Sequence, residues 1–277
     1  TRYPCVRIGG FTSSLLNHLT FTKSLKPMGL ISQIKSNILA KPYFLVIGAG
    51  RGGTSLLTAM LDYNSGLEVA LERFAFDYLL GQKMPPEKVK LLDKRLIYFQ
   101  KACQQEANQS SQYWGNKITT EQITALQECY SAIWPDYLDS FIMEVIGQKR
   151  VVYIVRDGRS CVQSKMKRTD QSYETALTRW KASVAILDHF QKRNVDLHLC
   201  RYEDLVKEPE ETLQAICKFL HVKFEEQMLD GPQNPIMPKM YAGDSIRQQP
   251  EAEVAWPESW TEDMKEELQI LGYLDEH

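Results

Sequence analysis

The hydrophobic pattern of this chain contains two nearly unbroken apolar runs and one alternating run, and each leads into a polar cluster. Residues 43–47 and 150–155 are rich in aromatic and β-branched side chains. Runs of this length are typical of parallel strands that are buried on both faces. Residues 195–199 alternate apolar and polar side chains and predict a third strand, and residues 67–71 predict a further short one.

Apolar residues at helical spacing fill the segments between these strands. One long helix, which we expect to open at Pro85, carries five apolar residues on one face: Val89, Leu92, Leu96, Phe99 and Cys103. Thr120 predicts the N-cap of the next helix, which Pro135 interrupts and Gly147 ends. Further helices are expected over residues 173–193, from Pro209 to Leu220, and from a capping box of Ser259 and Glu262 to Gly272.

Strands that alternate with helices predict the α/β class, with a parallel β-sheet covered by helices on both faces. We expect a single α/β domain over residues 42–277, with a helical insertion between Pro85 and Gly147. Residues 1–41 predict an N-terminal arm of irregular structure, and nothing in that arm suggests chemistry.

Composition and charge exclude several classes of function. The formal net charge is −2, so no global basic field would recruit nucleic acid, and no apolar run approaches the ~20 residues of a membrane span. The six cysteines show no metal-type pairs: Cys5, Cys103, Cys129, Cys161, Cys200 and Cys217. We expect them to be mostly reduced, apolar residues of a cytoplasmic protein without a metal site. The oligomeric state stays open.

A glycine-rich loop follows the first strand, and we expect it to bind an anion. Residues 48–53 have the sequence GAGRGG and lead into a helix that begins near Thr54. Glycines let the backbone approach a ligand closely, and a helix N-terminus presents unpaired N–H groups and the positive end of the dipole. A tight turn without a ligand is the alternative interpretation.

The loop alone leaves three ligand classes open. The spacing of Gly48 and Gly53 fits a Walker A loop, but the lysine of that motif is missing, which argues against a P-loop kinase. With Gly50, the same glycines satisfy the G-x-G-x-x-G pattern of NAD(P)-dependent oxidoreductases, and Glu72 follows at about the distance of a ribose-binding acid. The third class is a sulfonate donor, whose transferred group would face Arg51.

Basic residues follow three of the predicted strands. Arg51, Arg156 and Arg201 each lie just beyond the end of one strand. Because ligands bind at the carboxyl ends of strands in open parallel sheets, we expect these arginines to gather around one multiply charged anion, together with Arg159 and Lys165. The alternative for any single arginine is a solvated surface charge.

These motifs resemble those of the sulfotransferases that use 3′-phosphoadenosine 5′-phosphosulfate (PAPS), and the resemblance covers about residues 43–220. Residues 50–57 (GRGGTSLL) resemble the 5′-phosphosulfate loop of that family. Residues 155–159, followed by Ser164, resemble its 3′-phosphate motif, and residues 201–205 (RYEDL) resemble the segment whose tyrosine lies by the adenine. The resemblance implies a P-loop-type sheet, PAPS as donor, adenosine 3′,5′-bisphosphate (PAP) as product, and a hydroxyl acceptor.

The resemblance also implies which residues contact the donor. It implies that the 5′-phosphosulfate contacts Gly50, Arg51, Gly52, Gly53, Thr54 and Ser55. It also implies that the 3′-phosphate contacts Arg156 and Ser164, and that the adenine lies beside Tyr202. The loop after Gly231 corresponds to the region that closes over the nucleotide in the family. In that loop, Arg247 is expected to be a second contact of the 3′-phosphate.

On the acceptor side, the resemblance implies Glu72 as the general base. Its spacing from Arg51 is that of the base in protein-tyrosine sulfotransferases, and a structural carboxylate paired with Arg73 is the alternative. Residues 114–117 (WGNK) resemble a W-G-x-K segment of bacterial members, which implies that Lys117 stabilises the leaving phosphate oxygen. A surface lysine is the alternative there. None of the five histidines stands where the small-molecule branch places its base.

Two departures narrow the branch of the family. Leu56 and Gly158 replace the tryptophan and proline that are common in the small-molecule branch, so the chain fits a bacterial or a protein-tyrosine or carbohydrate branch better. An NAD(P)-dependent oxidoreductase and a non-catalytic nucleotide-binding scaffold stay open as alternatives. The acceptor is not predicted.

Overall fold

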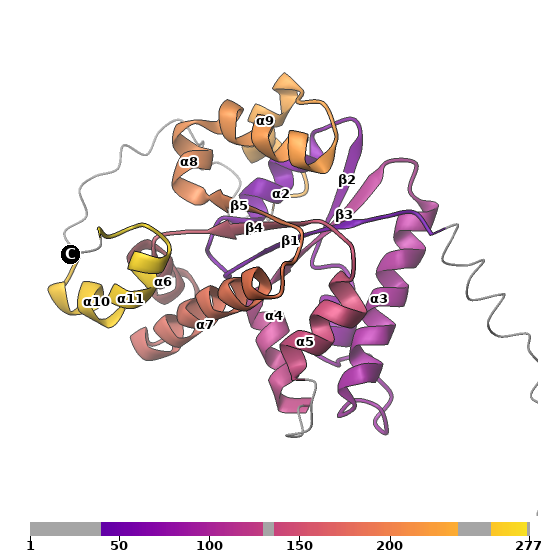
Figure 1. The fold of residues 1–277 in the computed structure, drawn as a ribbon, viewed down its shortest axis with the longest axis horizontal. Coiled ribbons are helices and arrows are strands. Elements are labelled where there is room, and N and C mark those ends of the chain that lie inside the picture. The colour runs from indigo at the N-terminus through magenta and orange to yellow at the C-terminus, as the bar shows by residue number, and fades with distance from the viewer. Residues whose placement is uncertain (1–39, 130–135, 238–255, 276–277) are drawn as a thin grey trace, which may run out of the picture. The chain divides into compact units, whose positions relative to one another are not determined.

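The computed structural model describes residues 40–129, 136–237 and 256–275 (Figure 1). By its internal contacts the chain divides into two units, Thr1–Ala40 and Lys41–His277. All the elements below belong to the second unit. No helix within the described ranges combines the length and the apolar character that crossing a membrane requires.

The described strands form one parallel, five-stranded sheet in the order β2-β3-β1-β4-β5. Their bounds are Phe44–Gly48 (β1), Leu67–Leu71 (β2), Tyr113–Thr119 (β3), Val151–Val155 (β4) and Leu197–Arg201 (β5). The chain leaves β1 toward one edge of the sheet and leaves β3 toward the other. Their carboxyl ends therefore border a topological switch point, which is where ligands bind in sheets of this kind.

Helices cover both faces of this sheet (Figure 1). Figure 1 shows α2, α8 and α9 on one face, and α3, α4, α5 and α7 on the other. The α-helices are α2 Thr54–Asp62, α3 Leu92–Gln109, α4 Thr120–Thr124, α5 Tyr137–Phe141, α6 Gly158–Thr169, α7 Tyr173–Lys192, α8 Tyr202–Lys207, α9 Pro209–Leu220, α10 Glu258–Asp263 and α11 Lys265–Ile270. Short 3₁₀- or π-helical turns span Ala75–Leu79, Ala125–Cys129, Ile142–Ile146 and Glu226–Gln233.

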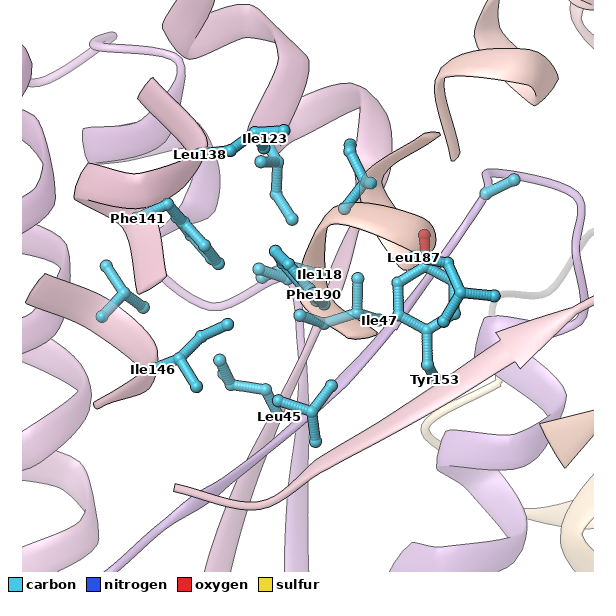
Figure 2. Packing of buried hydrophobic residues seen from close by; sticks show 14 of the residues in the cluster. Leu45, Ile47, Ile118, Ile123, Leu138, Phe141, Ile146, Tyr153, Leu187 and Phe190 are labelled. Atoms are coloured by element: carbon cyan, nitrogen blue, oxygen red, sulfur yellow. The ribbon is translucent and has the colours of Figure 1, made fainter. Parts of the chain in front are cut away.

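The two faces of β1 explain its unbroken apolar run. Leu45 and Ile47 belong to the larger core, together with Phe190 of α7 (Figure 2). Phe44 and Val46 belong to the smaller core, on the face that α2 and α9 cover. Successive side chains of a strand point to opposite faces, so a strand covered on both sides carries no polar positions.

The parallel α/β fold agrees with the prediction, but the segment between Pro85 and Gly147 is not purely helical, because it contributes the inner strand β3. The hydrophobic pattern did not predict this strand, because the stretch Gly115-Asn116-Lys117 has no alternation of apolar and polar residues. Asn116 and Lys117 are 0% and 3% exposed, and both have partners in the fold. Gly115 is required because the ring of Phe44 crosses it: an added Cβ would lie 2.3 Å from that ring.

Three helix boundaries also differ from the prediction. Helix α3 begins at Leu92 rather than at Pro85, and residues 85–91 form turns before it. The N-cap of α4 is Thr119, one residue before the expected Thr120. Helix α10 begins at Glu258 after Pro257, without a side-chain cap, so the capping box expected at Ser259 does not form. Pro135 lies outside the described residues.

Candidate functional site

The glycine loop between β1 and α2 folds back on itself at the switch point. The N–H of Gly52 donates to the carbonyl of Ala49 at 2.9 Å, which closes the turn. Gly53 is the N-cap residue of α2 and has a φ of 93°, and an added Cβ there would lie 2.3 Å from Cδ2 of Tyr202. No side chain of the described residues caps α2. The first N–H groups of that helix can therefore donate hydrogen bonds to a bound anion.

Arg156, directly after β4, reaches the glycine loop. Its Nη1 donates to the carbonyl of Arg51 at 3.2 Å, and its guanidinium lies 4.2 Å from the ring centroid of Tyr202. The indole N–H of Trp180 donates to the carbonyl of Arg156 and steadies this turn. The Nε of Arg156 is buried and has no hydrogen-bond partner among the described residues. A buried donor without an acceptor is costly, so this position fits a bound anion.

Ser164 of α6 joins the same group of residues. Its hydroxyl accepts a hydrogen bond from Nε of Arg51 at 3.1 Å. The structure thus brings together Arg51, Arg156, Ser164 and Tyr202, which come from the ends of β1, β4 and β5 and from α6. The predicted contact Arg247 lies outside the described residues.

Three basic residues that we expected around the same anion have partners elsewhere. Arg201 stacks on the ring of Tyr273, with its guanidinium 4.0 Å from the ring centroid, and donates to the carbonyl of Gly272. Arg159 forms two side-chain hydrogen bonds with Asp157, which raise the pKa of the guanidinium further. Lys165 is buried and pairs with the carboxylate of Glu121. The structure therefore does not place these three side chains around the predicted anion.

Glu72 lies at the end of β2, where two nearly buried side chains hold it. Nζ of Lys117 pairs with Oε1 of Glu72, and Nε2 of Gln122 donates to Oε2 at 2.6 Å. The N–H of Glu72 donates to the carbonyl of Lys117 at 2.7 Å. The side chain of Glu72 remains 25% exposed, so a ligand can reach it. Arg73, the alternative partner, pairs with Glu106 instead.

Three of the six described non-glycine residues with positive φ lie near these groups, and the others, Asp170, Asn194 and His221, lie at or just after helix ends. Arg51, Glu72 and Phe74 are non-glycine residues with φ values of 69°, 55° and 65°. Such conformations persist only where the surrounding structure imposes them, and they cluster at active sites. Here they occur in the loop and just beyond the end of β2.

The first turn of α4 connects the loop with Glu72. The carboxylate of Glu121 accepts from the N–H of Gly50 at 2.9 and 3.1 Å, and Gln122 contacts Glu72. Burial alone would raise the pKa of Glu121, but the charge and hydrogen bond of Lys165 and the N–H of Gly50 outweigh it, so this pKa is lowered. The sequence predicted neither contact, because a carboxylate or an amide in a first helical turn gives no local sign of a partner about 50 or more residues away.

One group of side chains in the described part of the chain lies close enough together to hold a metal ion: Asp136, Asp139 and His189. Asp139 already accepts hydrogen bonds from His189 and, at 2.7 and 2.8 Å, from Arg193. Its oxygens therefore have protein donors, and the group ties α5 to the end of α7.

A model described as "Sulfotransferase family" matches residues 42–226 of this chain. Over 201 residues, the chain is 26% identical to the protein-tyrosine sulfotransferase of Drosophila melanogaster, covering 68% of this chain and 40% of that protein. It is 24% identical to protein-tyrosine sulfotransferase 2 of Gallus gallus, covering 68% and 53%. The chain thus spans about half the length of the curated relatives that it matches.

Solved structures share the fold at lower identity. The sulfotransferase domain from the curacin biosynthetic pathway matches with a TM-score of 0.55 and 19% identity, covering 84% of this chain and 98% of that one. The sulfotransferase domain from a Synechococcus olefin synthase matches with a TM-score of 0.52 and 18% identity, covering 86% and 96%.

Proposed function

Because the chain belongs to the sulfotransferase family, we propose that it transfers a sulfuryl group from PAPS to an acceptor hydroxyl and releases PAP. We assign this activity to residues 42–277, the predicted α/β domain. The observation that carries the proposal is the convergence of Arg51, Arg156 and Ser164 from separate elements onto the uncapped end of α2.

The donor site divides into two anion subsites. Arg51 and the backbone amides from Gly53 to Ser55 bind the 5′-phosphosulfate. Gly50 and Gly52 shape the loop, because their own N–H groups are held by Glu121 and by the carbonyl of Ala49. Arg156 and Ser164 bind the 3′-phosphate, and Tyr202 lies beside the adenine. The unpartnered Nε of Arg156 supports this fit, because a phosphate oxygen would supply the missing acceptor. Arg247 stays a prediction.

Glu72 is the general base of the proposed reaction. The acceptor oxygen bonds to sulfur as the bond from sulfur to the bridging phosphate oxygen breaks, and the acceptor proton passes to Glu72. Lys117 places a positive charge beside Glu72 and stabilises the leaving oxygen. No step uses a metal. A cytoplasmic location stays a prediction.

Three variants separate binding from chemistry. Glu72→Gln is expected to lower turnover by about 10²-fold or more while PAP affinity stays within about twofold, because general base catalysis contributes about 10²–10⁴-fold. Arg51→Ala should likewise lower turnover more than PAP affinity. Arg156→Ala should mainly weaken PAP binding, by about 10–100-fold, as expected for a charge-assisted hydrogen bond. A discontinuous assay of PAP release measures turnover, and isothermal titration calorimetry measures PAP affinity.

Arg179→Ala, which removes an exposed arginine of α7, is the matched control and should change neither quantity. Equal losses of turnover and affinity in all three site variants would contradict the assigned roles.

The relatives' names make a tyrosine peptide the first acceptor to test. A thermal-shift comparison of PAP with NAD, NADP and ATP addresses the alternatives: an oxidoreductase requires stabilisation by NAD or NADP, and a scaffold would bind PAP yet show no turnover.

A further inference from the structure

We infer that Gln122 is a positioning residue that fixes the carboxylate of Glu72 relative to the donor loop. The inference rests on the proposed function, because it concerns the orientation of the proposed base. It starts from the contact between Nε2 of Gln122 and Oε2 of Glu72, at 2.6 Å.

The side-chain amide of Gln122 is held in one orientation. Gln122 is 4% exposed, and its Oε1 accepts a hydrogen bond from the N–H of Thr119 at 2.9 Å. An amide carries its acceptor and its donors on opposite sides. Turning it over would place N–H groups against the N–H of Thr119 and an oxygen against the carboxylate of Glu72. The helix cap therefore dictates that the donor side faces Glu72.

Glu72 in turn receives one fixed donor on each oxygen. Lys117 pairs with Oε1 and Gln122 with Oε2, and both of these partners are nearly fully buried. An ionised carboxylate offers about four lone-pair positions, so two remain for an acceptor hydroxyl. The carboxylate is thus restrained without being blocked, which is what a general base requires.

The same turn of α4 also fixes the position of Glu72 relative to the glycine loop. Glu121 precedes Gln122 and binds the N–H of Gly50, while buried Lys165 holds its carboxylate. Consecutive residues of α4 therefore contact the loop and the base. A displacement of about 1 Å in such a constellation can cost about 10²-fold in rate. Loss of the Gln122 donor should consequently lower kcat and leave donor binding intact.

A capping role alone would make a different prediction, and Gln122→Glu separates the two. Glutamate at this position still accepts from the N–H of Thr119, since Glu and Gln serve equally in a capping box. It has no N–H group to offer Glu72. Gln214→Glu is the matched control, because Nε2 of Gln214 donates to Oε1 of Glu210 at 3.0 Å on the exposed face of α9, so the same kind of bond is lost there.

The experiment measures PAP release from PAPS with a tyrosine peptide, with 4-nitrophenol and with water alone as acceptors, together with PAP affinity and the melting temperature. We expect Gln122→Glu to lower kcat by about 10²-fold with PAP affinity within about twofold of the wild type, and Gln214→Glu to change neither. An unchanged kcat in Gln122→Glu would overturn the inference, as would a parallel loss of PAP affinity in a variant that keeps the wild-type melting temperature.

A second variant covers the case in which two facing carboxylates prevent folding. The exchange Glu72→Gln with Gln122→Glu restores one donor and one acceptor across the pair, and it should regain the melting temperature and PAP affinity without regaining kcat. Gln122→Met removes the donor without adding charge and should lower kcat to the same extent as Gln122→Glu. If Glu72→Gln alone leaves kcat unchanged, the proposed base is wrong; if it lowers kcat while Gln122→Met does not, only the inference about Gln122 is wrong.

Discussion

Single residues of this site are constrained by backbone geometry as much as by their chemistry. Gly53 combines a positive φ with the close approach of the Tyr202 ring, so it joins the glycine loop to the predicted adenine contact. Arg51 and Glu72, the residues proposed to act on the transferred group and the acceptor, both have positive φ although they are not glycines. The fold thus imposes unusual conformations on the residues that the proposed chemistry uses.

At this scale we predict that Gly53→Ala weakens PAP binding by more than about tenfold. A Cβ in the left-handed region costs roughly 1–2 kcal/mol, and here it would also lie 2.3 Å from Cδ2 of Tyr202 and displace that ring. Gly272→Ala is the control, since Gly272 has a φ of 68° but an added Cβ would meet no atom closer than 3.4 Å. Both variants should lose stability in thermal denaturation, and only Gly53→Ala should lose affinity. Equal affinities would contradict the role of Tyr202.

At the scale of elements, buried ion pairs link segments that are distant in the sequence. Lys165 of α6 and Glu121 of α4 meet beneath the loop after β1, and Lys117 of β3 meets Glu72 at the end of β2. Each pair joins one nearly fully buried lysine to a carboxylate that also receives other hydrogen bonds. Breaking such a pair leaves a buried charge without compensation, which is strongly destabilising.

The pair under the loop makes stability depend on pH. The pKa of Glu121 is lower in the folded than in the unfolded state, so its ionisation stabilises the folded state. This contribution to the free energy of unfolding is complete above the unfolded-state pKa of about 4.3 and is lost as the pH falls through the folded-state pKa of Glu121. Glu121→Gln should therefore cost about 3–5 kcal/mol at pH 7, and the difference from the wild type should shrink below about pH 4. Urea denaturation at several pH values measures it.

Lys192→Met provides the control for that pH series. It breaks the exposed pair between Lys192 and Asp188 on α7 and should cost less than about 1 kcal/mol. A difference between wild type and Glu121→Gln that stays constant from pH 7 to pH 3 would contradict the proposed ionisation of Glu121.

At the scale of the whole molecule, the described cysteines report on global unfolding. Burial raises the pKa of Cys103 and Cys200 to about 12 and that of Cys161 and Cys217 to about 11. All four are buried free thiols, whereas Cys129 is half-buried. Thiols of this kind are unreactive until they are exposed and ionised.

We predict that, of the described cysteines, a thiol reagent at pH 7.5 labels Cys129 first and labels the four buried ones only at the rate of unfolding. Peptide mass spectrometry after timed labelling measures each site separately. PAP should slow the labelling of the four buried sites, because a ligand that binds only the folded state stabilises it by about 2.7 kcal/mol at 100 times its dissociation constant. Labelling of Cys161 as fast as that of Cys129 in the folded protein would contradict this prediction.

The sequence by itself determined the strands β1 and β4, because burial on both faces leaves a pattern of apolar residues that needs no partner to be recognised. It also predicted the glycine loop, because glycines at fixed spacing are a local property, whereas the motif that ends in Ser164 was predicted from its resemblance to the sulfotransferases. In the structure Arg51 contacts Ser164 and Arg156 contacts the loop, and the contacts of these residues with a donor stay a prediction.

Only the tertiary structure decided how polar residues without a local pattern are used. Strand β3 is hidden in the sequence because Asn116 and Lys117 are buried by virtue of partners about 45 residues away. Arg201 was expected at the anion but stacks on Tyr273, and Gln122 contacts Glu72, which lies 50 positions earlier in the sequence. The physical reason is that a buried polar group pairs with whichever distant segment the fold brings next to it. The periodicity of hydrophobic residues contains no information about which segment that is.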